Sequence, residues 1–167
     1  METRVVKLDP ANIDQTRIKE AAALIDQGAL VAFPTETVYG IACRAKCDSL
    51  ARLDELKGRP DEKHFTLHIG RSGDVQKYVP TIGLKARKLI RNTWPGPLTI
   101  VFELCQKDMD IQRKNFEQDV FDRLYKEDSI GIRYPDHAVA AMLLQQTSHP
   151  VVAPSANLTG RAPAING

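Results

Sequence analysis

The sequence predicts an α/β fold contained in one domain. Short apolar runs, typical of buried strands, alternate along the chain with segments in which apolar residues recur at helical spacing. The chain has 167 residues, of which 43% are hydrophobic and 26% are charged. This length suits one sizeable core and is short for two, so we expect residues 1–167 to form a single domain.

The residue pattern of the N-terminal part of the chain predicts two strands and two helices. Residues 5–8 suit a short strand, and residues 12–27 suit a helix with one apolar face that ends at Gly28. Residues 29–33 are apolar throughout, which is typical of a strand covered on both faces. A second helix is expected over residues 49–57, before a Gly-Arg-Pro break.

The middle of the chain predicts a strand, a helix and a further strand. Residues 65–69 alternate apolar and polar side chains, which indicates one apolar face and places Thr66 beside His68 on the other. Residues 84–92 are expected to form a helix that ends before a rigid Trp-Pro-Gly-Pro turn. Residues 98–104 then suit another buried strand.

The last third of the chain begins with residues 105–128, which are polar, charged and weakly periodic. We expect this segment to be an irregular connection with one helical turn around residues 120–125. Residues 129–133 suit a strand, and residues 136–146 suit a helix. Residues 150–153 suit a last short strand.

Polar residues follow four of these predicted strands, and ligands of open α/β sheets bind just beyond strand ends. If the four strands share one sheet, these residues can converge on one concave surface. A cation, hydroxyls, an amide and an imidazole on one surface suit an anionic small molecule. The residues concerned are Thr35, Glu36, Thr37, His68, Arg133, Ser155 and Asn157.

Two cations, Lys57 and Arg59, flank a glycine at a predicted helix end. The pair suits a polyphosphate, although lysine is also common at helix C-termini for reasons of the helix dipole. The sequence contains no GxxxxGK[ST], GxGxxG, HExxH or GxSxG motif, so the standard phosphate-loop, dinucleotide and zinc-protease sites are disfavoured, and we expect no protein nucleophile.

Charge and cysteine content narrow the class of protein further. The formal net charge is only +2, so the overall charge does not by itself indicate nucleic acid binding. Cys43, Cys47 and Cys105 are odd in number and form no CxxC pair, which argues against a disulfide framework or a zinc site and favours a reducing cytoplasm. We expect no export signal and no membrane span.

Five motifs occur in one order between residues 9 and 160. They are Phe-Pro-Thr-Glu-Thr-Val-Tyr-Gly, Lys-Gly-Arg-Pro, Trp-Pro-Gly-Pro-Leu-Thr, Ile-Arg-Tyr-Pro and Ala-Pro-Ser-Ala-Asn-Leu-Thr-Gly. Together they resemble the YrdC/Sua5 family. The resemblance implies a twisted mixed sheet flanked by helices, with a central positively charged cavity. It also implies the synthesis of threonylcarbamoyl-AMP and pyrophosphate from L-threonine, bicarbonate and ATP.

The family pattern implies a role for each matching residue. It places Thr35, His68 and Arg133 against threonine, with Arg133 as the partner of its carboxylate. It assigns Lys57 and Arg59 to the nucleotide phosphates. The implied Mg²⁺ travels with the nucleotide, so no protein metal site is expected. The blocks that line the nucleotide pocket contain Thr99, Ser155 and Asn157.

Later steps in the family imply further partners. A transfer complex of other proteins moves the threonylcarbamoyl group to adenosine 37 of tRNA. The family also suggests an alternative, a double-stranded RNA binding module without catalysis. The basic residues concerned are also explained by a solvated helix face, which we favour because no aromatic residues are interleaved with them. The basic residues behind that alternative are Lys85, Arg87, Lys88 and Arg91.

Two departures from the family pattern are visible. His64 stands near the position where the family usually has a proline, and the chain ends at Gly167, so we expect the usual C-terminal segment to be lacking. A related domain of a hydrogenase-maturation carbamoyltransferase is a further alternative, but its acylphosphatase-like region and zinc-finger cysteines have no counterpart in this sequence.

Overall fold

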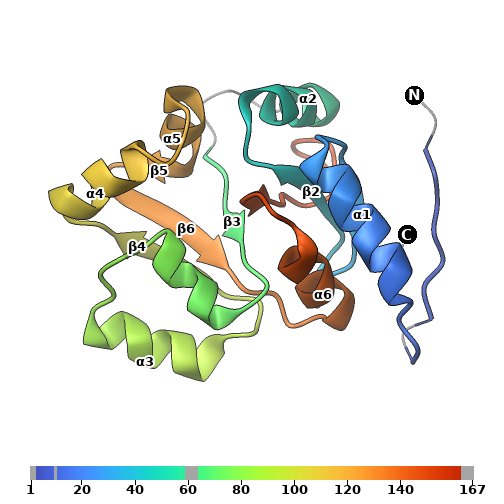
Figure 1. Cartoon of the computed structure of the whole chain (residues 1–167), viewed down its shortest axis with the longest axis horizontal. Helices are drawn as coiled ribbons and strands as arrows, with labels where there is room; N and C mark the ends of the chain where they lie inside the picture. Colours follow the sequence, from blue (N-terminus) through green and yellow to red (C-terminus); the bar gives the residue numbers. More distant parts are fainter. Residues whose placement is uncertain (1–2, 10, 59–63, 163–167) are drawn as a thin grey trace.

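The computed structural model describes residues 3–9, 11–58 and 64–162 (Figure 1). Helices and strands alternate through this part of the chain, as the sequence predicts. In order, the elements are α1 (Gln15–Asp26), β1 (Val31–Phe33), β2 (Gly40–Arg44), α2 (Cys47–Lys57), β3 (Leu67–His68), the 3₁₀ helix η1 (Ser72–Lys77), α3 (Leu84–Thr93), β4 (Thr99–Glu103), α4 (Gln106–Arg113), α5 (Gln118–Leu124), β5 (Tyr125–Lys126), β6 (Ser129–Arg133), α6 (Ala138–Gln146) and β7 (Val151–Val152).

All the strands belong to one mixed sheet, which confirms the predicted fold class. The strand order is β1-β2-β7-β3-β6-β4, and β5 pairs with β6. The pair β3–β6 is parallel and the other pairs are antiparallel. As a result β1 and β4 are the two edges of the sheet.

One face of the sheet carries the larger core. Its residues form a row across five strands, because their positions are paired in register. Side chains of α2, α4, α5 and η1 pack on this row, including Leu53, Met109 and Phe121, all of which are buried. The row consists of Cys43, Val152, Leu67, Ile132 and Ile100.

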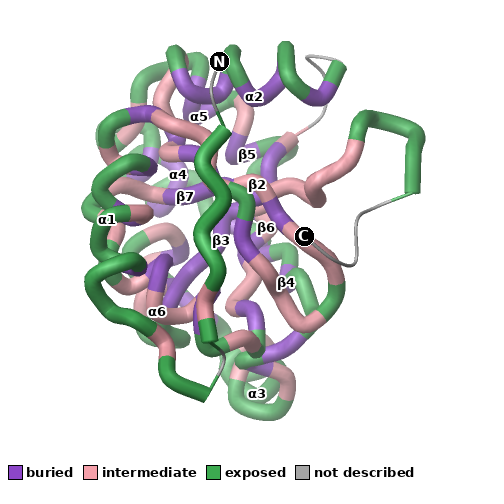
Figure 2. The backbone as a smooth tube through the Cα atoms, turned by 90° about the vertical axis from the view of Figure 1, so that its right-hand side faces the viewer, coloured by how far each residue is buried: buried purple, intermediate pink, exposed green. Residues whose placement is uncertain are grey.

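The opposite face is covered at one end of the sheet and open at the other. Over β2 and β7, Ala42 and Val151 pack against α1 and α6. Over β6 and β4 the same face carries half-buried Gly131 and exposed Thr99 and Val101. Strands in a sheet rotate relative to their neighbours, and over this many strands the rotation turns the face away from α1 and α6. Figure 2 shows β4 and β6 on the side of the molecule opposite α1 and α6. We call this uncovered part of the sheet the open face.

Several predicted elements differ from the structure because of their place in the sheet. Residues 29–33 and 98–104 were expected to be covered on both faces, and both expectations are wrong. Strand β1 is an edge strand with Ala32 exposed, and edge strand β4 alternates exposed and buried residues. Residues 65–69 were expected to have one polar face, but β3 lies inside the sheet and both Leu67 and His68 are buried.

Other differences arise where local signals are weak. Residues 5–8 form no strand. Strand β2 and helix α4 were not predicted, since neither shows a clear period in the sequence. The predicted helical turn near residues 120–125 corresponds to α5. Within the described part of the chain, no helix is both long and apolar enough to cross a membrane.

A close approach between β3 and α6 generates a stability prediction. A Cβ atom added at Gly70 would lie 2.7 Å from the backbone nitrogen of Gln145 and 3.0 Å from the carbonyl oxygen of Ala141. We expect Gly70→Ala to lower the free energy of unfolding by about 1–3 kcal/mol, measured by urea unfolding. Gly73→Ala is the control, because nothing lies within 4 Å of its Cβ position. Equal losses in both variants would contradict the prediction.

Candidate functional site

The loop of residues 34–39, which follows β1, is organised by one hydroxyl. Oγ1 of Thr35 donates a hydrogen bond to the carbonyl oxygen of Val38 over 2.6 Å. The same oxygen accepts hydrogen bonds from the backbone N–H groups of Thr37 and Val38, each over 3.3 Å. Thr35 therefore determines the shape of this loop, which we call the signature loop.

The signature loop is tied to β6 by an ion pair. Nη2 of Arg133 lies 2.7 Å from Oε1 of Glu36 and donates a second hydrogen bond, over 2.9 Å, to Oγ1 of Thr37. The Arg133 and Glu36 side chains are only 16% and 18% exposed. Oε2 of Glu36 and Nε of Arg133 are also buried, and neither has a hydrogen-bond partner in the described part of the chain. The site thus offers one unused acceptor beside one unused donor.

His68 lies next to Arg133, because the two residues are paired in register on parallel strands. Nδ1 of His68 is 3.2 Å from the carbonyl oxygen of Thr66. A carbonyl only accepts, so Nδ1 carries the proton and Nε2 is the bare acceptor. Burial, helped by the charge of Arg133 and opposed by the Thr66 carbonyl and Glu36, lowers the pKa of His68 to about 4. The ring is therefore neutral at pH 7.

Thr99 completes a row of three residues across the sheet. It is paired in register with Arg133 on the side away from His68, and it is exposed. Paired residues direct their side chains to the same face, so His68, Arg133 and Thr99 lie side by side beneath the signature loop. The structure brings His68 and Arg133 together and, through Glu36 and Thr37, joins them to the loop that Thr35 organises, as expected from the strand ends. Thr99, which the family resemblance implies for the nucleotide pocket, lies in the same row.

Lys57 contacts a second loop, residues 154–161, through its side chain. Its ammonium donates hydrogen bonds to the carbonyl oxygens of Ser155, over 2.5 Å, and Asn157, over 2.6 Å. Only 5% of Lys57 is exposed. The Asn157 amide nitrogen donates to the carbonyl oxygens of Leu158 and Arg161. In this structure Lys57 shapes the loop that carries Ser155 and Asn157, which we call the C-terminal loop.

The two loops lie side by side. The Ala156 N–H donates to the Tyr39 carbonyl oxygen over 2.7 Å, and Gly40 forms an isolated bridge with Ser155. Strands β1 and β7 end here, whereas β3 and β6 end toward the opposite side of the sheet. The four strand ends therefore share a sheet but not an edge. The expectation of one convergent cluster holds only because the signature loop reaches Arg133.

Two groups of predicted residues fall outside this cluster. Arg59 lies outside the described residues. The four cations of the predicted RNA patch are exposed on α3, and none of them takes part in an ion pair between described residues. They are Lys85, Arg87, Lys88 and Arg91.

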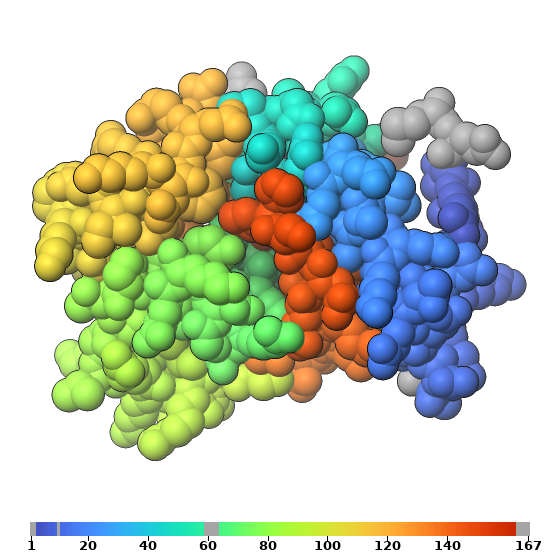
Figure 3. Space-filling model, viewed as in Figure 1, coloured from blue at the N-terminus to red at the C-terminus, as the bar shows by residue number. Residues whose placement is uncertain are grey.

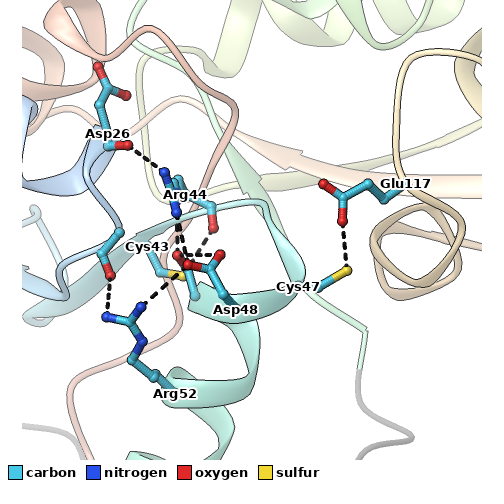
Figure 4. Close-up of polar contacts among 9 residues, drawn as sticks. Asp26, Cys43, Arg44, Cys47, Asp48, Arg52 and Glu117 are labelled. Carbon is cyan, nitrogen blue, oxygen red and sulfur yellow. Dashed lines mark hydrogen bonds and ion pairs between the residues drawn. The ribbon is translucent and has the colours of Figure 1, made fainter.

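Two of the cysteines, Cys43 and Cys47, lie near the ends of β2 and α2 (Figure 4), and the third, Cys105, is exposed. Cys43 is buried, and Sγ of Cys47 donates to Oε2 of Glu117 over 3.0 Å. Burial raises the pKa of Cys43 to about 12, and the hydrogen bond to Glu117 raises that of Cys47 to about 11. Beside them, Arg44 joins the ends of α1 and α2 through the Asp26 carbonyl oxygen and Asp48.

The described residues include neither a disulfide nor a set of three or more His, Cys, Asp and Glu side chains that could hold a metal ion. One cavity, of about 280 Å³, lies between η1 and the segment joining α6 to β7, on the face shown in Figure 3. A positively charged central cavity stays a prediction. Glu36 is the site residue that the predicted ligand set omitted, although it lies inside the polar stretch that drew attention to the loop.

Comparison with known proteins shows one family. The family model Sua5/YciO/YrdC, described as "Telomere recombination", matches residues 23–167. The threonylcarbamoyl-AMP synthase of Bacillus subtilis (strain 168) is 34% identical over 154 residues, which cover 92% of this chain and 42% of the relative. The synthase of Halorhodospira halophila is 32% identical over 149 residues, covering 89% of this chain and 72% of the relative.

Solved structures agree with this result. Pyrococcus abyssi Sua5 complexed with L-threonine has a TM-score of 0.77 and 32% identity, covering 92% of this chain and 42% of that one. Escherichia coli YciO, at 23% identity, has a TM-score of 0.73 over 92% of this chain and 70% of that one, and supports the fold alone. The chain spans less than half the length of the Bacillus and Pyrococcus relatives.

The lowered pKa of His68 predicts a loss of stability in acid. The unfolded chain takes up a proton on His68 near pH 6.5, whereas the folded chain takes it up only near pH 4. The contribution of His68 to the free energy of unfolding is therefore fully present above pH 6.5, and it is lost as the pH falls toward 4. Relative to the His68→Gln variant, we expect the free energy of unfolding of the original chain to fall by about 3 kcal/mol more between pH 7 and pH 4. A ring that titrates near pH 6.5 by NMR would contradict this.

The contacts of Lys57 predict that its ammonium holds the C-terminal loop in place. Lys57→Met leaves the Ser155 and Asn157 carbonyl oxygens without this donor. We expect amide hydrogen exchange at Ala156 and Asn157 to accelerate at least about tenfold, which corresponds to about 1.4 kcal/mol. Lys107→Met, at an exposed position of α4, is the matched control. Unchanged exchange in both variants would show that the loop is held by other contacts.

Proposed function

The chain belongs to the Sua5/YciO/YrdC family, and from this premise we propose that it forms threonylcarbamoyl-AMP and pyrophosphate from L-threonine, bicarbonate and ATP. The observation that carries the proposal is the unused donor–acceptor pair at Arg133 and Glu36. An amino acid is a zwitterion, so it needs one cation for its carboxylate and one anion for its ammonium. The relative of Pyrococcus abyssi was solved with L-threonine in complex, and its chain matches this one with a TM-score of 0.77.

Threonine placed between the signature loop and the open face meets groups suited to each of its parts. Its carboxylate pairs with Arg133 through the unused Nε–H, and its ammonium pairs with Oε2 of Glu36. Thr35 keeps its contacts within the loop and acts by holding Glu36 and Thr37 in position. His68, neutral at pH 7, offers the bare Nε2 nitrogen as a hydrogen-bond acceptor for the amine.

The proposed chemistry proceeds by positioning rather than by a covalent enzyme intermediate. The neutral amine of threonine attacks the carbon of bicarbonate, and water leaves to give a carbamate. A carbamate oxygen then attacks the α-phosphorus of ATP in line, and pyrophosphate leaves. Such phosphoryl chemistry depends on alignment and charge neutralisation, which agrees with the lack of a nucleophile motif in the sequence.

The nucleotide belongs beside the C-terminal loop in this proposal. Ser155 and Asn157 lie on this loop, next to the signature loop, and the buried Oδ1 of Asn157 has no hydrogen-bond partner among the described residues. Thr99 lies on the open face. Lys57 acts first by shaping this loop, and Arg59 is assigned to the phosphates by its motif alone. Mg²⁺ enters with ATP as part of the substrate, and its place at the site stays a prediction.

Transfer to tRNA, the partner proteins of that transfer, a cytoplasmic location and double-stranded RNA binding all stay predictions. We favour catalysis over an RNA-binding module without activity, because the buried polar groups lie at Arg133 and Glu36, away from the basic residues of α3. Binding of RNA requires only those exposed cations and does not explain the buried ion pair between Arg133 and Glu36.

The direct test is release of pyrophosphate from ATP by the purified chain. We expect release only when both L-threonine and bicarbonate are present. Arg133→Ala removes the partner of the threonine carboxylate, so kcat/KM for threonine falls by at least about 100-fold. Arg71→Ala, which removes an exposed arginine elsewhere, leaves the rate unchanged.

Calorimetry with L-threonine separates binding from turnover. Threonine that binds to the original chain but not to Arg133→Ala supports the assigned pocket even before catalysis is measured. Release that does not depend on threonine, or a chain that neither binds threonine nor releases pyrophosphate, would refute the proposal.

A further inference from the structure

The outer edge of β4 offers unpaired backbone groups. Leu104 N–H donates to the Asp128 carbonyl oxygen over 2.8 Å, and these positions continue the β4–β6 register. Hydrogen-bonded and non-hydrogen-bonded pairs alternate along an antiparallel ladder. Ile100 and Phe102 therefore bond to β6, whereas Thr99, Val101 and Glu103 direct their N–H and C=O groups outward. No other described segment forms a backbone hydrogen bond with these three residues.

This edge lacks the features that usually prevent strand addition. Natural edge strands are often short, or carry a lysine, a proline or a bulge. Strand β4 is five residues long with the sequence Thr-Ile-Val-Phe-Glu, and its register with β6 is uninterrupted. Val101, in the middle, is 65% exposed.

A groove of about 330 Å³ runs beside the edge. It lies between β4, the connection of residues 79–83 and the first turn of α3. Apolar residues Val79, Ile82, Ala86, Val101 and Phe102 line it together with the polar residues Thr81 and Glu103. The groove therefore suits an apolar side chain that projects from a strand added to β4.

Helix α3 lies beside β4 (Figure 1) and borders the groove through Ala86. None of the ten residues of α3 is buried, and Leu84, at its start, is 86% exposed. The four exposed cations of α3 do not line the groove, but they lie on the helix that borders it and give its surface a positive charge.

We propose that the β4 edge, the groove and α3 together bind an extended acidic segment of a partner protein. The segment adds a strand to β4, inserts an apolar side chain into the groove and directs Asp or Glu residues toward α3. A match to β4 requires about five residues, or roughly 17 Å of extended chain. Outward backbone groups and an apolar groove favour a polypeptide over nucleic acid, whose phosphates would use the cations alone. A second copy paired through β4 would bring two basic α3 helices to one edge.

The probe is a fluorescein-labelled peptide, Asp-Glu-Val-Thr-Val-Glu-Asp, added to the whole chain. We expect its binding to slow amide hydrogen exchange at Val101 and Glu103 by at least about tenfold, while Ile100 and Phe102, already bonded to β6, change little. The same peptide with alternate amides N-methylated is the backbone control and should fail to bind. A peptide with Lys in place of Asp and Glu should fail as well.

Two protein variants test the same surface. Lys85→Glu with Lys88→Glu should weaken binding of the acidic peptide at least about tenfold by fluorescence anisotropy, whereas Lys19→Glu, on α1, should not. Val101→Pro removes one outward N–H without breaking a bond to β6 and should weaken binding similarly. If Val101→Pro fails to fold, the N-methylated peptide still decides the question.

Several outcomes would overturn the proposal. Unchanged exchange at Val101 and Glu103 with about 1 mM peptide present would show that the edge does not accept a strand. Binding that survives N-methylation would mean simple charge attraction. Displacement of the peptide by a 16-base-pair RNA duplex without strand protection would assign α3 to nucleic acid, and dimerisation lost in Val101→Pro would assign the edge to a second copy.

Discussion

The arrangement of the candidate site depends on the ion pair between Arg133 and Glu36, which joins residues 97 positions apart in the chain. Two partly buried charges lose much of their hydration, and only their mutual attraction offsets that loss. Removing one partner would leave the other charge buried without compensation. The pair thereby holds the signature loop over the open face. A zwitterionic ligand can enter this arrangement without leaving either charge unpaired, because it supplies one charge of each sign.

The open face exists because one continuous sheet is covered unevenly. Helices α1 and α6 cover β2 and β7, and the twist of the sheet then turns the same face outward at β6 and β4. Small or polar residues occupy the uncovered positions, among them Gly131 and Thr99. A larger side chain at Gly131 would lie against Thr66 and Thr99, whose atoms are 3.5 Å from the position of an added Cβ. The open face can therefore contact a ligand while the core on the other face of the sheet stays covered.

Strand β4 serves two surfaces at once. The side chains of Thr99 and Val101 project onto the open face, whereas their backbone N–H and C=O groups point to the outer edge beside α3. The two directions are perpendicular in a pleated strand, so the proposed substrate and the proposed partner segment do not compete for the same atoms. Occupancy of the edge would nevertheless restrain the strand that positions Thr99. The C-terminal loop, held by Lys57, lies beside the signature loop.

The sequence by itself determined the elements and residues that carry strong local signals. Helices α1 and α3 and strand β6 lie where their periodicity predicts, and the motif order indicates the family that the comparisons show. Thr35, His68 and Arg133 stood out because each lies at or just beyond the end of a predicted strand. Only the tertiary structure decided that β1 and β4 are edges, since an apolar run shows that residues avoid water and not where a strand lies in its sheet. Only the tertiary structure brought Glu36 to Arg133, because that contact depends on strand order and twist, which no spacing within the sequence encodes.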